Sequence, residues 1–594
     1  MATELKRNKF IVSKALKNFV LAAVLTAAAT QLAHTADSMI VGHIVGPDAV
    51  SAINLVLPFV EVLNCMGFLI CFGSNAMCAQ AIGCNDKDKV ARTFTSTLIS
   101  VMTFGLFVSL AISFFSRDIV AYLSDDPRLD EMAYQYIHTY ALGGWLQMMS
   151  YGLCLFVATD GRPRIVTKAV VVGALANGIA DVVFIWALDM GVMGAAIGSL
   201  SMFVFNILIL TNYLRKPTSS YKLKWPGRDF FSIFLHNIKE GAPITLSNSL
   251  MAVTILVINA IVLHYLGADG LFLWSVCLQM LLLSYVFIDG IIESLFAVGG
   301  ILVGERDLRG LQILVREALV IISVLVAALI VIMYIPGLVG LLFGVTDATL
   351  AAELNHVLRI FALMLIPFAT TQILLSAYQL VGHEGASVTT AAAQTISLVL
   401  MVWLAAESEN IELWWGYAIG AALVLLAQLT LTYIQSRRQH ASISALTMIP
   451  NKQEGYTFDR SIPYQTDDVY TVLQQIDQFL KTTGIDATTL FEVNLCCEEL
   501  MTNIAKHSAG HITHHSFDVH FNVTNDAVFV TIKDAGKPFD PIKAGKMADP
   551  NIGNKEYQHL GLRLVTNIIP DITYKYMYGQ NTVFIYRQIS HTDK

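Results

Sequence analysis

The sequence predicts a polytopic α-helical membrane protein, with about twelve transmembrane helices in two six-helix lobes, followed by a C-terminal cytosolic α+β domain. Three observations predict this class. The 594 residues are 55% hydrophobic and only 14% charged, which is too apolar for a soluble chain. Apolar stretches of about 20 residues, long enough to span a bilayer, recur from Lys17 to about Arg437. Beyond Pro450 the composition is that of an ordinary soluble domain.

The charges of the loops predict the orientation. The first residues carry several lysines and lead straight into an apolar helix without a small-residue cleavage site, so we expect an uncleaved start. Basic residues gather in alternate loops, on the side of these lysines: Lys87, Lys89, Arg92, Arg162, Arg164, Lys168, Arg215, Lys216, Lys222, Lys224, Arg306, Arg309, Arg437 and Arg438. The opposite loops are acidic: Asp125, Asp126, Asp130, Glu131, Asp347, Glu407, Glu409 and Glu412. The positive-inside rule then places both termini in the cytoplasm of a multi-pass protein of the plasma (inner) membrane.

The composition indicates which classes of binding partner to expect. We expect contact with the lipid bilayer and a small-molecule substrate, and no nucleic acid. The net charge of −7 itself says little about partners, since the local sign of charge in each loop is what matters here. The eight cysteines form no pair with metal-ligand spacing and are interpreted as packing residues.

An internal repeat divides the membrane part. The segment 42–48 corresponds to 263–269, 83–86 to 304–307, and 194–198 to 416–420. We therefore expect an N-lobe over residues 1–215, a C-lobe over 216–437, a linker over 438–455 and a cytosolic domain over 456–594. In transporters built from repeats, substrate sites lie between the repeats.

Polar residues inside the helices distinguish the two lobes. Asn177 and Asp181 are four residues apart and share one helix face. An intramembrane carboxylate costs roughly 2.5 to 3.5 kcal/mol on insertion scales, so a function is expected for it and for Asp37. The repeat places apolar residues at the corresponding positions of the C-lobe: Ile258, Val399 and Trp403. Symmetry therefore does not require the acids, and we interpret them as a proton or Na⁺ site; the alternative is polar pairing that holds helices together.

Three segments resemble multidrug and toxic compound extrusion (MATE) transporters: Asp37–His43, Asp160–Arg164 and Gly191–Ser199. The resemblance covers about the first 440 residues. It implies a cation site made of Asp37, Asn177, Asp181 and Ser199, with Ser199 where the family more often has Thr. It also implies antiport by rocking of the two lobes.

Other polar residues of the helices are candidates for a substrate cavity. His34 lies one turn before Asp37 and could tune its proton affinity, or serve as a packing histidine. Glu61, Asp289 and Glu293 could attract organic cations or act as polar contacts between helices. Glu293 departs from the family, which often has Gln there.

The C-terminal part alternates between the helical and strand periods. We expect strands at 456–462, 517–523, 527–532, 572–578 and 582–586, and helices at 466–479 and 487–507.

Two motifs of this domain carry chemistry. Glu499 and Asn503 share one helix face, and offer a carboxylate to orient a nucleophile and an amide oxygen for Mg²⁺. The segment Asp534–Pro541 follows a strand, where an Asp can accept a hydrogen bond and Gly536 lets a flat base approach the backbone.

With Gly561 opening a later helix, these motifs resemble the histidine-kinase-like (GHKL) ATPases, most closely the anti-sigma-factor serine kinases. The resemblance implies ATP and Mg²⁺ as cofactors. Its implied roles are Glu499 as the base, Asn503 as the Mg²⁺ ligand, Asp534 as the adenine reader with Gly536 and Phe539 in the same loop, Gly561 in the phosphate loop, and Thr582 as an adenine contact before the last strand.

Departures leave alternatives open. His559 stands where the family usually has the first glycine of the phosphate loop, so the domain could instead bind a protein partner without ATP. No phosphoacceptor-histidine helix follows Arg438, which argues against a sensor histidine kinase. The group His511, His514 and His515 has no partner at metal-binding spacing and is interpreted as a solvated loop.

The leading functional hypothesis is an H⁺- or Na⁺-coupled antiporter that exports small, cationic or amphiphilic compounds. Its ATP-binding cytosolic domain would regulate transport or signal its state, through a cytosolic protein partner in the second case. The alternatives are a membrane-anchored serine/threonine protein kinase or receptor that uses the transporter part as a sensor, and a lipid or oligosaccharide flippase. ATP does not drive transport in any of these hypotheses, since no GxxxxGK[ST] motif occurs.

Overall fold

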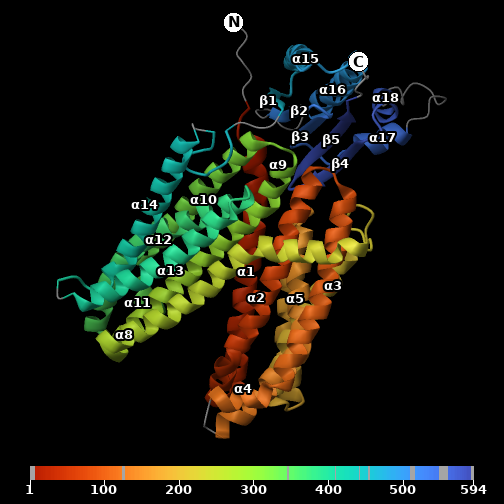
Figure 1. Cartoon of the computed structure of the whole chain (residues 1–594). Coiled ribbons are helices and arrows are strands. Elements are labelled where there is room, and N and C mark those ends of the chain that lie inside the picture. The colour runs from red at the N-terminus through yellow and green to blue at the C-terminus, as the bar shows by residue number, and fades with distance from the viewer. Residues whose placement is uncertain are drawn as a thin grey trace.

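The structure is a computed structural model of the chain. It describes residues 7–123, 127–343, 345, 347–408, 410–439, 442–451, 455–508, 516–547 and 560–589. Within these residues, twelve helical segments are long and apolar enough to cross a membrane. They form two bundles, and a small α+β domain covers one end of both (Figure 1). The predicted fold class is confirmed.

The first bundle is the N-lobe. Its helices are α1 (Phe10–Ile44), α2 (Pro47–Gly83), α3 (Lys87–Phe114), α4 (Ser116–Leu123), α5 (Pro127–Thr159), α6 (Pro163–Asp181) and α7 (Gly191–Leu214). After α6 the chain continues as a π-helical turn, Val182–Ala187. Such turns are rare and frequent at functional sites, and this one begins directly after Asp181.

The second bundle is the C-lobe. It contains α8 (Phe230–Ser294), α9 (Gly300–Gly304), α10 (Leu308–Tyr334), α11 (Leu338–Leu342), α12 (Ala348–Leu380), α13 (Glu384–Glu407) and α14 (Trp415–Arg438). A short 3-10 turn, Gly227–Asp229, precedes α8, and a π-helical turn, Leu295–Gly299, follows it. The helix α8 contains two spanning segments, which meet at Gly267, where φ is 67°.

The turns between helices repeat from one lobe to the other. Gly46 and Gly267 have positive φ, and so do Gly161 and Gly382, at corresponding positions of the repeat. The aspartates that cap α3 and α10 also correspond, since Asp86 accepts from the Lys89 N–H and Asp307 from the Gly310 N–H. The internal repeat read from the sequence is thus present in the backbone.

Small residues join the lobes near the C-terminal domain. A Cβ atom on Gly83 would collide with the carbonyl oxygen of Ile301, and one on Gly304 with that of Gln80. The backbones of α2 and α9 therefore touch, as small residues permit between membrane helices. We call this the docked end of the membrane domain. Toward the other end the bundles diverge (Figure 1).

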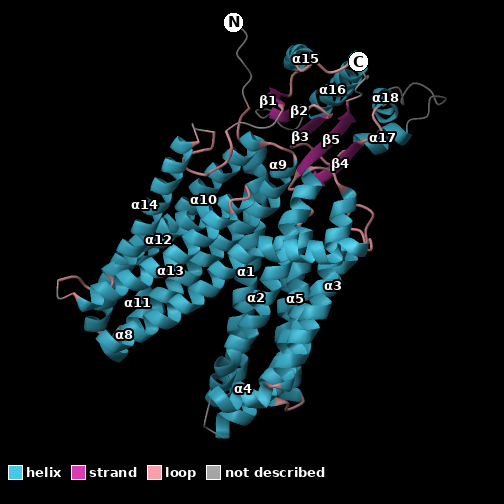
Figure 2. Cartoon of the chain, in the orientation of Figure 1, coloured by secondary structure: helices cyan, strands magenta, loops and turns pink. Residues whose placement is uncertain are grey.

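The C-terminal domain is a five-stranded antiparallel sheet with helices on one face (Figure 2). Its strands are β1 (Tyr456–Pro463), β2 (Ser516–Val523), β3 (Ala527–Asp534), β4 (Ile572–Met577) and β5 (Gln580–Gln588), in the order β1-β2-β3-β5-β4. Its helices are α15 (Thr466–Thr482), α16 (Ala487–Ser508), α17 (Pro541–Met547) and α18 (Leu560–Ile568). The predicted elements are present, but β5 starts two residues earlier than expected because it pairs with β3 and β4 along its length.

The two faces of this sheet pack against different partners. Val583 and Ile585 belong to the core of the C-terminal domain, whereas Phe584 between them belongs to the core of the membrane domain. The second face is therefore buried against the docked end, and we call it the docking face. It includes alternate polar residues of β2 that are all buried: Ser516, Asp518, His520 and Asn522.

Candidate cation and nucleotide sites

Four predicted residues meet in the N-lobe, where α1, α6 and α7 pack together. Asp181 is fully buried at the end of α6, and Asn177 donates from Nδ2 to its Oδ2 over 3.2 Å. Ser199 on α7 donates from Oγ to Oδ2 of Asp37 on α1 over 3.4 Å. The carboxyl groups of Asp37 and Asp181 lie within hydrogen-bonding reach of each other. The three helices thus bring all four side chains into one cluster.

Three oxygen atoms of this cluster have unused capacity. Oδ1 of Asp37, Oδ1 of Asn177 and Oδ1 of Asp181 are buried and accept no hydrogen bond from the part of the chain that the structure describes. Buried carboxylates need a proton, a cation or a donor. Amide and carboxylate oxygens are also the ligands that hard cations prefer. The donor set therefore fits a proton or Na⁺.

A glycine and a tyrosine complete the cluster. Gly198 on α7 leaves room for Asp181, because a Cβ there would collide with Oδ1 of the carboxylate. Tyr136 on α5 is buried, lies within hydrogen-bonding reach of Ser199 and stacks on Tyr140 with ring centroids 5.8 Å apart. The sequence analysis missed Tyr136, although two tyrosines four residues apart on an apolar helix are a readable signal of one shared face.

The predicted cavity residues stand outside this cluster. His34 is exposed and acts on Asp37 only electrostatically. Glu61 on α2 is exposed and accepts from Asn64 Nδ2 over 3.1 Å. Asp289, which is exposed, and the half-buried Glu293 both lie on α8, near Tyr151 of α5 in the other lobe.

In the C-terminal domain, α16 and α18 bring Glu499 and Gly561 into contact. Both Glu499 and Asn503 are half-buried on α16. A Cβ on Gly561, at the start of α18, would collide with Oε2 of Glu499. Only a glycine leaves the start of α18 this close to the carboxylate. Residues 548–559, including His559, and 509–515, with the three histidines, lie outside the described residues.

The loop after β3 holds Asp534 in a fixed orientation. Its Oδ1 accepts from the Gly536 N–H over 2.8 Å and from Asn581 Nδ2 over 3.0 Å. Burial raises the pKa of Asp534, while the hydrogen bonds and the charge of Lys14 oppose that rise. Asn581 also accepts from the N–H of Phe539 over 3.1 Å, so it ties the two ends of the loop together.

Asn581 was not predicted from the sequence, and its neighbour Thr582 was. Thr582 lies inside β5, not before it, because β5 pairs with β3 from Asn581 onward. It is buried and lines a small cavity of about 20 Å³ with Ile11 and Lys533, on the docking face. The structure therefore brings together Asp534, Gly536 and Phe539, and places Thr582 on the other side of the sheet.

These groups fit a nucleotide with Mg²⁺. A held carboxylate in a glycine loop suits an adenine amino group, and the Asn503 amide oxygen suits a hard cation. The start of α18 presents backbone N–H groups, which favour phosphate.

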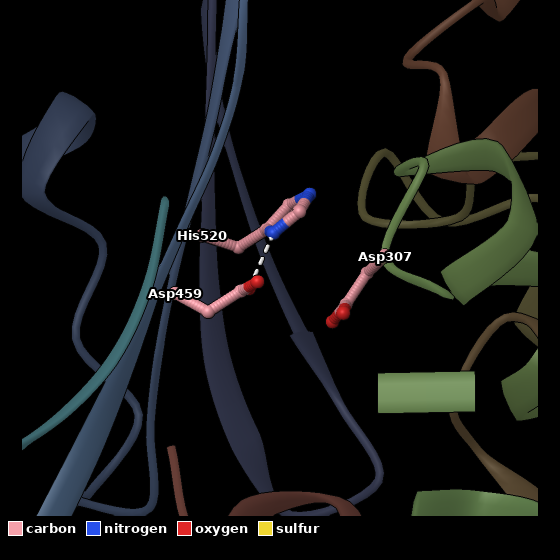
Figure 3. A group of neighbouring side chains, drawn as sticks. All are labelled: Asp307, Asp459 and His520. Atoms are coloured by element: carbon pink, nitrogen blue, oxygen red, sulfur yellow. Dashed lines mark hydrogen bonds and ion pairs between the residues drawn. The ribbon is translucent and has the colours of Figure 1, made fainter. Parts of the chain in front are cut away.

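An arginine before α1 joins the docking face to the C-lobe. Arg7 binds Asp307 over 2.6 Å, Asp459 over 3.1 Å and Asp518 over 3.4 Å, and its side chain is 1% exposed. His520 Nδ1 lies 2.7 Å from Oδ1 of Asp459. Figure 3 shows Asp307 reaching from the membrane domain toward this pair.

Asp307, Asp459 and His520 are close enough to hold a metal ion. Arg7 already binds both carboxylates, so its guanidinium supplies the positive charge of the group. Although burial works against the ionised carboxylate, Arg7, His520 and Lys533 hold the pKa of Asp307 well below its usual range. We interpret the cluster as an ionic anchor and not as a metal site. A second ion pair, Lys533 to Glu305 over 2.6 Å, lies on the same side.

The N-lobe contacts the docking face through its own network. Asp160 accepts from Tyr213 OH over 2.8 Å and from the Ser220 N–H over 3.1 Å. Lys575 on β4 donates to Ser220 Oγ over 2.8 Å, and Tyr578 OH donates to the Thr159 carbonyl over 2.8 Å. The C-terminal domain therefore contacts both lobes at once.

Comparisons with known proteins follow this division. Residues 22–183 match the MatE family model, and residues 462–586 match the model of the histidine kinase-like ATPase domain. The chain joins a MATE domain to a histidine kinase-like ATPase domain. Both resemblances read from the sequence are confirmed.

Among curated proteins, the MATE domain is similar to the multidrug export protein MepA. The Staphylococcus aureus protein is 25% identical over 258 residues, which are 43% of this chain and 56% of the relative. The Staphylococcus saprophyticus protein is 24% identical over the same shares. The chain thus spans about half the length of the curated relatives it matches.

Solved structures agree with the MATE fold. A structure of MATE in complex with MaL6 is 19% identical, with a TM-score of 0.67, and the match covers 73% of this chain and 98% of that one. An outward-facing conformation of a multidrug resistance MATE family transporter is 20% identical, with a TM-score of 0.67, and the match covers 73% and 97%. At these identities the likeness concerns the fold alone.

Proposed function

We propose that the chain is a cation-coupled antiporter that exports small cationic or amphiphilic compounds. The observation that carries this proposal is the cluster of Asp37, Asn177, Asp181 and Ser199, with its three buried oxygens that have no donor among the described residues. The name of the MepA relatives, multidrug export proteins, supports the same class of substrate.

Binding of a cation to the cluster can change the relative positions of α1 and α6. Two carboxylates within hydrogen-bonding reach repel each other when both are ionised, and a shared proton or a Na⁺ removes this repulsion. Asp37 is on α1 and Asp181 on α6, so uptake of the cation draws these helices together and its release lets them separate. The helix α1 also contacts the C-lobe, since Ser13 Oγ donates to Glu317 Oε2 of α10 over 3.1 Å, and it can pass the change to the packing of the lobes.

We further propose that the C-terminal domain binds ATP with Mg²⁺ and regulates transport from the cytoplasmic side. In this proposal Asp534 reads adenine, Asn503 ligates Mg²⁺, and Glu499 orients a nucleophile. Bound ATP would supply phosphate charge beside the start of α18. Because the docking face contacts both lobes where they meet, the domain favours the conformation in which the docked end is closed.

A second candidate function is a protein serine kinase that uses the MATE domain as a sensor. It is favoured by one observation, the contact of Glu499 with the start of α18 in the predicted phosphate loop. In this case the C-terminal domain would transfer phosphate to a cytosolic protein partner, and transport would be secondary.

Transport by the purified full chain in proteoliposomes tests the first proposal. We expect an imposed H⁺ or Na⁺ gradient to drive efflux of a fluorescent organic cation. Asp181→Asn should reduce this efflux to the leak of empty vesicles. The amide is neutral, so it can neither bind a proton nor balance the charge of a Na⁺ ion. Asp189→Asn is the control, since Asp189 lies in the exposed turn after the same helix and its φ of 52° suits Asn.

Normal gradient-driven efflux by the Asp181→Asn protein would overturn the coupling proposal. For the C-terminal domain, Asn503→Ala should abolish Mg²⁺-dependent binding of ATP and leave the Asp181 cluster intact. Transfer of phosphate to a protein, lost in Asn503→Ala and unaffected by Asp181→Asn, would favour the kinase.

A further inference from the structure

A lysine of the first membrane helix reaches the predicted adenine loop. Lys14 is half-buried on α1, and its Nζ donates to the carbonyl oxygen of Ala535 over 3.0 Å. Ala535 stands between Asp534 and Gly536, the two residues that define the loop after β3. The lysine charge also acts on the Asp534 carboxylate. A membrane-domain side chain therefore helps to hold the loop that is proposed to read the base.

The remaining hydrogen bonds of this loop come from the C-terminal domain itself. Asn581 binds Asp534 on one side and the carbonyl oxygen of Lys537 over 2.9 Å on the other. The N–H of Ala535 donates to Tyr464 OH over 3.3 Å. The carbonyl of Ala535 faces α1 and receives the lysine. Within the described chain, the loop is thus held from both sides, by its own domain and by the membrane domain.

The start of α1 is fixed along the sheet, which sets the position of Lys14. Before it, Asn8 donates from Nδ2 to Ser516 Oγ on β2 over 2.6 Å, and the Ile11 carbonyl accepts from Gln580 on β5. After it, Asn18 donates from Nδ2 to the Tyr578 carbonyl over 2.9 Å. These contacts follow one another along three turns of the helix. Lys14 therefore moves only when α1 shifts along the sheet or leaves it.

The same helix carries the cation cluster. Lys14 and Asp37 both lie in the unbroken α1, which spans 35 residues from Phe10 to Ile44. At 1.5 Å of rise per residue they are roughly 35 Å apart along the axis. No proline interrupts the helix between them. A displacement of α1 at Asp37 can therefore reach Lys14 by shifting the start of the helix along the sheet.

We propose that Lys14 is a positioning residue of the nucleotide site, so that the affinity of the C-terminal domain for ATP depends on the position of α1. This inference rests on the proposed function and names how its two sites are coupled. Linkage makes the coupling reciprocal, because a helix position that strengthens ATP binding is itself favoured by ATP.

The test compares single variants of the purified full chain. The probe is a fluorescent ATP analogue with Mg²⁺, titrated to obtain Kd. Lys14→Met should weaken binding by about tenfold, as expected for loss of a charge-assisted hydrogen bond that orders the loop. Lys14→Arg keeps a donor and a charge and should restore most of the affinity. Lys17→Met is the matched control, since Lys17 lies on the same helix and is exposed.

A second readout needs no nucleotide. Hydrogen exchange of the peptide that contains residues 534–540 should be faster in Lys14→Met than in the natural chain and Lys17→Met. A merely structural role would instead lower the melting temperature and raise exchange throughout the C-terminal domain.

Unchanged affinity and unchanged exchange in Lys14→Met would overturn the inference and leave the proposed function intact. Absence of nucleotide binding by the natural chain would overturn both. Weaker binding confined to Lys14→Met, with rescue by Lys14→Arg, would support the inference.

Discussion

The two lobes share their turns and differ in where they keep their acids. In the N-lobe, Asp37 and Asp181 lie inside the membrane domain, at positions for which the repeat gives apolar residues in the C-lobe. In the C-lobe, Glu305 and Asp307 lie at the docked end and pair with cations of the docking face and of the N-terminal segment. The paired acids Asp37 and Asp181 thus occur in the N-lobe, whereas the C-lobe supplies the ion pairs that attach the C-terminal domain.

Comparing the two repeats separates residues that the shared fold requires from residues that serve a function of one lobe. Residues required by the fold recur, as Asp86 and Asp307 do at the starts of α3 and α10. Residues that occur in one lobe only need an explanation other than the fold that both lobes share. Asp307 recurs as a helix cap, and in the C-lobe it has the additional task of binding Arg7.

The largest effect is expected from breaking the C-lobe anchor. Arg7→Met leaves the buried Asp307 and Asp518 and the half-buried Asp459 without their shared cation, and loss of the partner of a buried ion pair typically costs about 3 to 5 kcal/mol. The C-terminal domain should detach from the docked end. Limited proteolysis within residues 438–455 should then become faster.

Lys9→Met is the control for this change. Its ion pair with Glu317 has a lysine that is 70% exposed, and exposed pairs contribute about 0 to 1 kcal/mol. Equal rates of cleavage in the two variants would show that Arg7 does not anchor the domain.

A smaller effect is expected from crowding the N-lobe cluster. Gly198→Ala places a methyl group against the Asp181 carboxylate, and overpacking of this kind costs about 1 to 3 kcal/mol. Cation-driven efflux should fall while the protein still folds. Gly178→Ala on α6 is the control, because a Cβ there meets nothing within 4 Å. If both variants transport alike, the close approach of α7 to Asp181 is not needed for coupling.

The smallest effect is a pH dependence of docking. The carboxylates of Asp307 and Asp459 raise the pKa of His520, although burial and Arg7 oppose that rise. Because the pKa is higher when docked than in the detached domain, protonated His520 stabilises docking at pH below about 6.5, and this contribution is lost as pH rises through the docked value. His520→Gln should flatten this loss, measured as the rate of linker proteolysis between pH 6 and 8.

Lys575 should strengthen docking as pH rises, whereas His520 weakens docking as pH rises. Burial lowers its pKa to about 8, so its charge opposes docking below that pH, and docking should tighten as pH rises from about 8 toward 10. A single monotonic pH profile in the natural chain from 6 to 10 would contradict this pair of assignments.

The fold was predicted well from the sequence, because hydropathy and the helical and strand periods carry it, whereas the grouping of Asp37 and Ser199 with Asn177 and Asp181 came from the family resemblance. A carboxylate such as Asp181 in an apolar run needs an explanation wherever it lies, and its spacing from Asn177 already places both on one face. Tyr136 was not predicted, because the free-energy cost of a tyrosine in an apolar helix is small compared with that of a carboxylate, and so it does not indicate a function.

The docking face could not have been predicted in the same way. Ser516, Asp518, His520 and Asn522 alternate with apolar residues, which is the pattern of a sheet with one face in water. Their burial depends on contacts more than a hundred residues away in sequence, such as that of Asp518 with Arg7. Lys14 belongs to the same class, since its acceptor is a backbone carbonyl, which has no signature in the sequence.

The segment that connects the two domains tethers the C-terminal domain to the C-lobe. The segment 442–451 folds back on itself through the bridge between Ile443 and Pro450, and Met448 packs against Leu374 and Tyr378 of α12. When the contacts with the N-lobe break, the domain therefore stays near its anchor at a high effective concentration, on the order of millimolar for a short tether. Reattachment is then intramolecular and fast, so the fraction of time spent docked is set within one molecule and does not depend on how much protein the membrane holds.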